Sequence, residues 1–349
     1  MTLPKTTRQY SYPELGSYNN LVIHEVPVGP PKANEVLVKT YAVSLQFCDL
    51  LIAAGLYPGH SPPRNLVPLS DMAGEVIAVG EDVKQWKKGD RVCANYMLDK
   101  LHNEETTAIG ATALGGAING VLTEFRTFPA HSLVEVPPHL SYEEASTLPC
   151  AALTAYNALL SGFEPLKAGD TILVQGTGGV AIFVLQFVVA SGATAIVISS
   201  SDEKLKIATK LGAKHVINYN TTPSWDQEVL KLTNGLGVDH VIEIAGNSTL
   251  ARSISSVRIS GSISILGLLG GLDNVPAVDI VYPCVSKGLN IRGFHVGSVA
   301  QFKNMNKLIS ANPDTTRPVI DKVFPFEETK EAFSYFQSQA HVGKVVIKL

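Results

Sequence analysis

The sequence contains few cysteines, and none of them form a metal-binding or disulfide pattern. The four cysteines, Cys48, Cys93, Cys150 and Cys284, lie far apart, with no Cys-x-x-Cys pair. This spacing argues against a disulfide framework and against a four-cysteine zinc lobe. It favours a reducing compartment, so we expect a cytoplasmic protein.

Long hydrophobic runs and a strong excess of one charge are also absent. The longest apolar run, Val180–Ala190, is far shorter than the ~20 residues of a membrane span. The net charge is only -3, which predicts no binding to nucleic acid or to a membrane surface. The first twenty residues lack an apolar core, so we expect no signal peptide.

The chain is long enough for two domains, and its predicted secondary structure changes near Ser141 from short strands to helix. At ~150 residues per domain, 349 residues suggest two. Before Ser141, short alternating runs such as 35–41 and 74–79 predict strands between dense Gly and Pro turns. Ser141 followed by Glu144 is a capping box, and the apolar spacing after it predicts a helix over 142–160.

From Asp170 onward, strand and helix patterns alternate. We predict strands at 170–176, 194–200, 215–219, 239–245 and 261–266, and helices at 179–191, 202–211, 225–232 and 249–257. An edge strand at 289–294, helices at 302–310 and 327–337 and a last strand at 343–349 complete the prediction. Such alternation is typical of an α/β fold with a doubly wound parallel sheet and helices on both faces.

A glycine-rich turn, GTGGVA, lies between the first predicted strand and helix of this region. Gly176, Gly178 and Ala181 match the G-x-G-x-x-G/A spacing that places a dinucleotide pyrophosphate at a helix start. Gly176 allows the tight turn, Gly178 allows the phosphates to approach, and Ala181 allows the helix to pack closely. The alternative is a plain tight turn in an α/β sheet.

The end of the second predicted strand favours NADP(H) over NAD(H). An NAD site usually has an acidic residue there, but this strand ends in Ser199, Ser200 and Ser201. We expect Asp202 to act as a helix N-cap that faces backbone amides. Lys204 and Tyr219 lie nearby in the sequence, and hydroxyls with a cation suit a 2′-phosphate. The alternative for Lys204 is an ordinary solvated helix lysine.

Several motifs along the whole chain resemble a known family. GTGGVA, LPCAALTAYNAL, SDMAGEVIAVG, KKGDRV and the final GKVVIKL resemble the medium-chain dehydrogenase/reductase superfamily, and most of all its zinc-independent alcohol-dehydrogenase-like and quinone-oxidoreductase-like branch. The resemblance implies a GroES-like β-rich catalytic domain over 1–150 and 300–349 and a Rossmann domain over 151–299. It also implies an active-site cleft between the domains and a homodimer formed through the strand at 289–294.

This chain lacks most of the zinc ligands found in the zinc-dependent members of the superfamily that it resembles. Zinc-dependent members use a Cys-x-x-Asp pattern, a Gly-His-Glu pattern and a later Cys or Asp, and a catalytic zinc needs three ligands. Here Asp49 matches, but Gln46 stands at the Cys position, and Leu69-Ser70-Asp71 replaces Gly-His-Glu. Only Cys150 occupies a ligand position, since Cys48 and His60 lie at the wrong offsets. We therefore predict no metal.

Without zinc, hydride transfer to an already activated acceptor remains feasible. We expect Gln46 to donate a hydrogen bond to a developing oxyanion, Tyr57 to donate a hydrogen bond or proton, and Thr154 to lie beside the nicotinamide. The alternatives are that Tyr57 packs on Pro58 and that Thr154 caps or packs its helix. The expected cofactor contacts lie at the carboxyl ends of the strands and near the C-terminus: Gly176, Thr177, Gly178, Gly179, Val180, Ser200, Ser201, Lys204, Tyr219, Ala245, Gly246, Gly267, Leu268, Phe294, His295 and Lys344.

These features predict a zinc-independent, NADP(H)-dependent oxidoreductase. Its substrate is expected to be a small molecule with an activated C=C bond, as in an enone or enal, or a quinone. Two alternatives stay open: a zinc-free alcohol or aldehyde dehydrogenase, and a non-redox auxiliary protein that keeps the fold and the cofactor.

Overall fold

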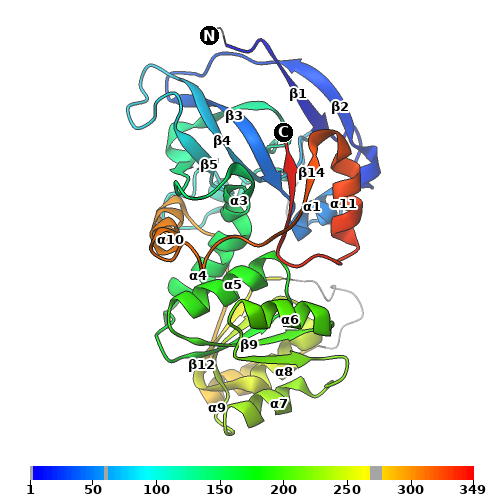
Figure 1. Ribbon diagram of the computed structural model, residues 1–349, viewed down its shortest axis with the longest axis vertical. Helices are drawn as coiled ribbons and strands as arrows, with labels where there is room; N and C mark the ends of the chain where they lie inside the picture. The colour runs from blue at the N-terminus through cyan, green and yellow to red at the C-terminus, as the bar shows by residue number, and fades with distance from the viewer. Residues whose placement is uncertain (1–2, 59–61, 268–276) are drawn as a thin grey trace. The chain divides into compact units, whose positions relative to one another are not determined.

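The chain divides into two units, both visible in Figure 1. The structure is a computed structural model that describes residues 3–58, 62–267 and 277–349. The first unit comprises residues 1–153, 297–313 and 317–349, and the second comprises residues 154–296 and 314–316.

The first unit is built on a seven-stranded sheet in its described residues. The strand order is β14-β15-β3-β4-β5-β7, β6 also pairs with β3, and β1 and β2 form a separate pair. The strands are β1 (Thr6–Ser11), β2 (Val22–Pro27), β3 (Glu35–Ser44), β4 (Asp71–Val79), β5 (Arg91–Ala94), β6 (Phe125–Pro129), β7 (Leu133–Glu135), β14 (Ile320–Pro325) and β15 (Lys344–Lys348). The helices are α1 (Phe47–Ala53), α2 (Thr107–Gly110), α3 (Tyr142–Ala145), α10 (Val299–Ala311) and α11 (Thr329–Gln337).

Three strands of this sheet meet at Ser44, the last residue of β3. Ser44 pairs with Asp71 at the start of β4 and with Val346 of β15, both antiparallel. Consequently the residues just after β3, at the start of β4 and in β15 lie together although they are far apart in sequence. This junction positions the polar cluster described below.

The helix predicted over 142–160 is wrong in its middle. The Ser141–Glu144 capping box is present, but α3 ends at Ala145, a π-helical segment covers Leu148–Ala152, and α4 covers Leu153–Leu160. Pro149 explains the break, because proline has no N–H and its ring clashes with the carbonyl four residues earlier, which is that of Ala145. The break leaves the Cys150 N–H without a regular helical acceptor.

The second unit is a six-stranded parallel sheet in the order β10-β9-β8-β11-β12-β13. The strands are β8 (Thr171–Gln175), β9 (Thr194–Ser199), β10 (His215–Asn218), β11 (Val238–Glu243), β12 (Val257–Ile265) and β13 (Asn290–Gly293). The helices are α4, α5 (Gly179–Ala190), α6 (Asp202–Lys210), α7 (Trp225–Leu232), α8 (Asn247–Ser256) and α9 (Val281–Lys287). In Figure 1, α5 and α6 lie on one side of β9, and α7 and α8 lie on the other.

The α/β class predicted from the alternating pattern is confirmed in this unit. Buried residues of the central strands, including Leu173, Ile196, Val241 and Ile263, form its core. Several details differ: α9 was not predicted, β12 begins at Val257 rather than at 261, and Ser201 rather than Asp202 caps α6, with its side chain accepting from Lys204 N. A serine oxygen accepts from the N3 amide readily, so the N-cap moves back by one residue.

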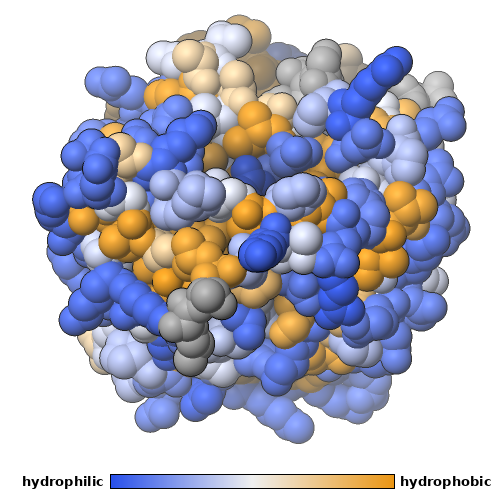
Figure 2. Space-filling view, turned by 90° about the horizontal axis from the view of Figure 1, so that it is seen from above, coloured by the Kyte–Doolittle hydropathy of each residue, from blue (hydrophilic) through white to orange (hydrophobic). Residues whose placement is uncertain are grey.

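Figure 2 shows one face of the molecule, on which hydrophobic and hydrophilic side chains alternate. Hydrophobic residues there form separate patches among hydrophilic side chains, as is common for protein surfaces. None of the helices in the described part of the chain combines the length and apolarity needed to cross a membrane.

Candidate functional site

The glycine loop, Gly176–Gly179, connects β8 to α5 in the second unit. Gly176 has φ +79°, in the left-handed region that favours glycine, so the tight turn predicted there is present. A side chain built at Gly178 would meet no atom within 4 Å, so the space beside this residue is open. Ala181 is buried, which lets α5 pack closely against the sheet.

The start of α5 has the chemistry that a pyrophosphate requires. Gly178 is the N-cap, and no side chain caps the first-turn N–H groups of this helix. Uncapped N–H groups and the positive end of the helix dipole favour an anionic group. Together with the open space at Gly178, they fit a dinucleotide, whose phosphates would be held by the backbone of the glycine loop.

The carboxyl ends of β9 and β10 hold the residues expected at the ribose. Ser200 is exposed and its backbone oxygen accepts from Asn220 Nδ2 at 3.0 Å. The Asp202 carboxylate accepts from Asn218 Nδ2 at 2.7 Å, so this acidic group already has a partner. Tyr219 is partly exposed beside them, its N–H donating to the Ser199 carbonyl. The two asparagines were not foreseen as site residues.

Other expected cofactor residues follow the remaining strands on the same edge of the parallel sheet. Ala245 and Gly246 follow β11, Gly267 follows β12, and Phe294 and His295 follow β13. Thr177 lies beside Ser199 with 3.5 Å between the two hydroxyl oxygens. Leu268 and His60 lie outside the described residues.

In the first unit, a hydrogen-bonded group that we call the Asp71 cluster forms at the junction of β3, β4 and β15. Asp71 is fully buried and accepts from Gln46 Nε2 at 2.5 Å, Ser70 Oγ at 2.7 Å and the Cys150 N–H at 3.1 Å. The Asp71 cluster therefore joins three of the positions compared with zinc ligands. Its centre is the Asp71 carboxylate, which stands in the sequence as the last residue of the Leu69-Ser70-Asp71 replacement.

A buried lysine lies beside the Asp71 cluster. Lys344 is 2% exposed and its Nζ donates to the Leu45 carbonyl at 2.5 Å. It was expected to contact the cofactor, but its contact in the structure is inside the first unit. Burial raises the pKa of Asp71, and the Lys344 ammonium opposes that shift.

A second buried carboxylate, Asp49, shares this environment. It accepts from the Gln46 backbone N–H at 2.6 Å, which caps the start of α1. Burial raises the pKa of Asp49 to about 7, while the Gln46 N–H and the Lys344 ammonium act in the opposite direction. Two buried carboxylates therefore share one buried cation.

Tyr57 lies close to this region and makes a contact that was not foreseen. Its phenol is hydrogen-bonded to Tyr96, which is 5% exposed. Burial raises the pKa of Tyr57 to about 12, although the bond from Tyr96 lowers it. Tyr57 therefore holds its proton at neutral pH. Thr154 is in the first turn of α4, where it is 8% exposed.

The donor set at the Asp71 cluster does not fit zinc. Zinc prefers thiolate sulfur, imidazole nitrogen and carboxylate oxygen in a tetrahedral arrangement. Here an amide and a hydroxyl occupy two of the ligand positions, and both hydrogen-bond to Asp71. No group of three or more His, Cys, Asp or Glu side chains in the described residues could hold a metal ion.

Comparison with known proteins decides the family. A family model described as alcohol dehydrogenase GroES-like domain matches residues 32–138, and one described as zinc-binding dehydrogenase matches residues 179–311. A zinc-type alcohol dehydrogenase-like protein of Schizosaccharomyces pombe is 46% identical over 348 residues, or 98% of this chain and 99% of that protein. This chain belongs to the medium-chain dehydrogenase/reductase superfamily.

Solved structures of this superfamily share the fold. A structure from Sinorhizobium meliloti 1021, provisionally described as an alcohol dehydrogenase, has a TM-score of 0.91 and 37% identity and covers 100% of both chains. The 2-octenoyl-CoA carboxylase reductase CinF, in complex with NADP and 2-octenoyl-CoA, has a TM-score of 0.84 and 25% identity and covers 99% of this chain and 88% of that one. These comparisons confirm the GroES-like and Rossmann-like units and indicate an oxidoreductase.

Proposed function

We propose that this chain is a zinc-independent, NADP(H)-dependent oxidoreductase that transfers a hydride to an activated C=C bond of an enone or enal, or to a quinone. The observation that carries the proposal is the Asp71 cluster, in which Gln46, Ser70 and Cys150 hydrogen-bond to one carboxylate. Simple alcohol oxidation normally relies on a zinc ion as Lewis acid, whereas an activated acceptor does not need one.

The residues of the first unit supply donors for such an acceptor. When bound, a nicotinamide dinucleotide supplies the hydride. Tyr57 keeps its proton because burial raises its pKa to about 12, so its O–H can donate to an oxygen that becomes negative. The side-chain amide nitrogen of Gln46 has two N–H groups, and one of them donates to Asp71. The second N–H keeps the donor role expected from the sequence.

NADP(H) is the preferred cofactor in this proposal. The exposed Ser200 follows β9 directly and carries no carboxylate, and Asp202 is engaged by Asn218. A 2′-phosphate would therefore meet hydroxyls and amides rather than an unpartnered acidic side chain, with Lys204 close behind in the sequence. None of the four cysteines forms a disulfide, which suits the cytoplasmic location that we also propose.

Titration of EDTA-treated protein with NADPH and NADH tests the proposal. We expect NADPH to bind at least about tenfold tighter, a difference of about 1.4 kcal/mol. Ser200→Asp should reverse the preference, because a carboxylate repels the 2′-phosphate and accepts from ribose hydroxyls. Fluorescence of the buried Trp225 provides the signal.

Ser224→Asp is the matched control, since Ser224 is an exposed serine at the N-cap of α7. It should leave the preference unchanged. Preference of the wild-type protein for NADH would contradict the role of Ser200.

Reduction of an enone and quinone panel by the same metal-free protein supports the reductase. Alcohol oxidation alone would favour the zinc-free dehydrogenase, and binding without turnover would favour the auxiliary protein.

A homodimer formed through the β13 edge is part of the proposal. In the described part of the chain β13 ends the strand order, and α9 before it exposes Val281, Tyr282 and Val285 at 71%, 73% and 79%. Exposed apolar side chains next to an open strand edge favour pairing with a second copy. We expect Val285→Glu to convert the dimer to a monomer, as measured by light scattering after size-exclusion chromatography.

Leu236→Glu is the control for this prediction. Leu236 is as exposed as Val285, at 75%, but lies in the turn before β11. It should leave the mass unchanged. A monomeric wild-type protein would refute the dimer.

A further inference from the structure

One buried carboxylate of the second unit takes no part in the proposed chemistry yet collects five hydrogen bonds. Glu243, the last residue of β11, is 0% exposed. Its Oε1 accepts from the N–H groups of Ala245 and Gly246, each at 3.0 Å, and from Thr249 Oγ1 at 2.6 Å. These bonds hold the turn that leads from β11 into α8.

The other oxygen of Glu243 reaches the neighbouring strand. Its Oε2 accepts from Gln175 Nε2 at 2.8 Å and from Ser253 Oγ of α8 at 2.5 Å. Gln175 is the last residue of β8, immediately before the glycine loop, and its Oε1 accepts the Ile244 N–H at 3.1 Å. The two side chains therefore fasten the end of β8 to the end of β11.

The hydrogen bonds between Gln175 and Glu243 lie where the strand order of the sheet reverses. From β8 the chain proceeds outward through β9 to β10 and then returns to the other side of β8 as β11. The strand order therefore reverses between β8 and β11. In open α/β sheets a ligand binds in the crevice outside the carboxyl ends of the strands at such a reversal.

We propose that Glu243 and Gln175 are positioning residues for the dinucleotide: they fix the distance between the glycine loop and the turn at Ala245–Gly246, and so set cofactor affinity without touching the cofactor. This inference rests on the proposed dinucleotide-binding function. The carboxylate is suited to the task because it only accepts, and every group that faces it donates.

Exchanging the two side chains tests the proposal. Glu243→Gln places an amide N–H₂ against the Gln175 N–H₂, and Gln175→Glu places two carboxylates together. In the double variant, the amide introduced at position 243 would accept through its oxygen from the Ala245–Gly246 turn. Its nitrogen would donate to the carboxylate introduced at position 175, which would still accept from the Ile244 N–H. The Ser253 hydroxyl, which also accepts from Gln175 Nε2 at 2.9 Å, can rotate to serve the exchanged pair.

We expect each single variant to bind NADPH at least about tenfold more weakly, and the double variant to return to within about threefold of the wild type. The KM for the dinucleotide should rise in the single variants while kcat changes little. Thr249→Val removes one donor to Glu243 from a partly buried helix position and should weaken NADPH binding severalfold. This variant replaces Glu243→Gln or Gln175→Glu in the test if either of them does not fold.

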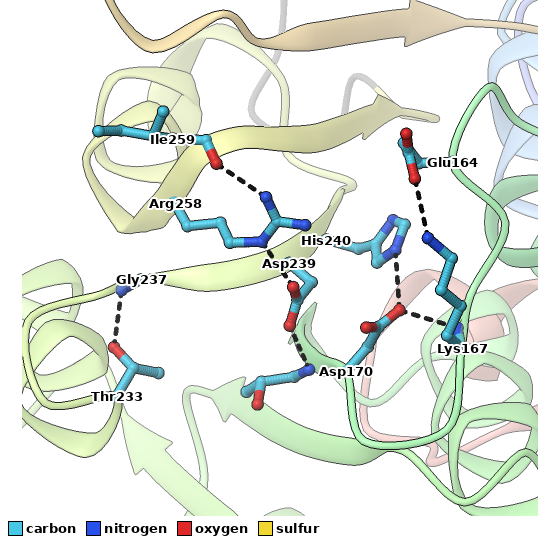
Figure 3. Close-up of polar contacts among 10 residues, drawn as sticks. Glu164, Lys167, Asp170, Thr233, Gly237, Asp239, His240, Arg258 and Ile259 are labelled. Atoms are coloured by element: carbon cyan, nitrogen blue, oxygen red, sulfur yellow. Dashed lines mark hydrogen bonds and ion pairs between the residues drawn. The ribbon is translucent and has the colours of Figure 1, made fainter.

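A matched control lies at the opposite ends of the same two strands. There the Asp239 carboxylate accepts from the Thr171 N–H of β8 at 2.7 Å and from Arg258 Nε at 2.6 Å (Figure 3). Asp239→Asn weakens a β8–β11 link of the same kind away from the crevice. It should lower the melting temperature and leave the dissociation constant for NADPH within about twofold.

The outcomes separate this inference from the proposed function. Wild-type affinity in folded Glu243→Gln protein overturns the positioning role, as does an equal loss of affinity in Asp239→Asn. Failure of the double variant to recover affinity also overturns it. A wild-type protein that binds neither NADPH nor NADH overturns the proposed function itself, and the inference with it.

Discussion

Gly178→Val is expected to abolish dinucleotide binding while the protein stays folded. The backbone of Gly178 has φ -76° and ψ -173°, which valine adopts without strain, and an added Cβ meets no protein atom within 4 Å. The new side chain would instead occupy the space through which a pyrophosphate approaches the loop and the start of α5. We expect affinity for NADPH to fall at least about 100-fold, or about 2.7 kcal/mol.

Calorimetric titration and thermal unfolding measured on the same sample check this prediction. Gly29→Val is the control, because Gly29 is exposed and also has no neighbouring atom within 4 Å of an added Cβ. It should change neither measurement. A folded Gly178→Val protein that binds NADPH like the wild type would show that the phosphates lie elsewhere.

Lys344→Met is expected to produce the largest loss of stability in the first unit. The substitution keeps the length of the side chain but removes the cation shared by Asp49 and Asp71, and it leaves the Leu45 carbonyl without its donor. Uncompensated buried charge costs about 3 kcal/mol or more. Calorimetry should show a transition lowered by roughly 6–12 °C for a unit of this size.

The stability lost in Lys344→Met should increase as the pH rises. Without the Lys344 ammonium, the pKa values of Asp49 and Asp71 rise further above their values in the unfolded chain. The folded state then retains protons that the unfolded state releases, so stability falls as the pH rises from about 4 through the folded pKa values. We expect Lys344→Met to be closer to the wild type at pH 5 than at pH 8.

Lys348→Met is the matched control on the same strand. Lys348 is largely exposed and pairs with Glu143 at the surface, 2.8 Å between Nζ and Oε1. Exposed ion pairs contribute about 1 kcal/mol or less, so the transition should move little at either pH. Equal effects of the two substitutions would contradict a special role for the buried ammonium.

Local patterns in the sequence predicted most elements of the second unit. The helix at 225–232 and the strand ends near the glycine loop lie where expected, because side-chain periodicity and glycine turns are local signals. The helix over 142–160 failed because the apolar spacing outweighed Pro149, which interrupts it.

The missed residues of the candidate site share one property. Nothing near Glu243 in the sequence indicates that Gln175, 68 positions away, donates to it. The signal available in the sequence was a glutamate that follows the apolar pair Val241-Ile242 and precedes Gly246 by three positions. Tyr96, Asn218 at the end of β10 and Asn220 after it gave no pattern, because their partners lie on other elements.

The sequence by itself determined the α/β class, the glycine loop and the departure from a zinc ligand set, since these depend on residue identity and short spacings. Only the tertiary structure decided that Asp71 gathers Gln46, Ser70 and the Cys150 amide, and that Lys344 is buried beside it. The physical reason is that β3, β4 and β15 meet through backbone pairing, which brings together residues up to 299 positions apart.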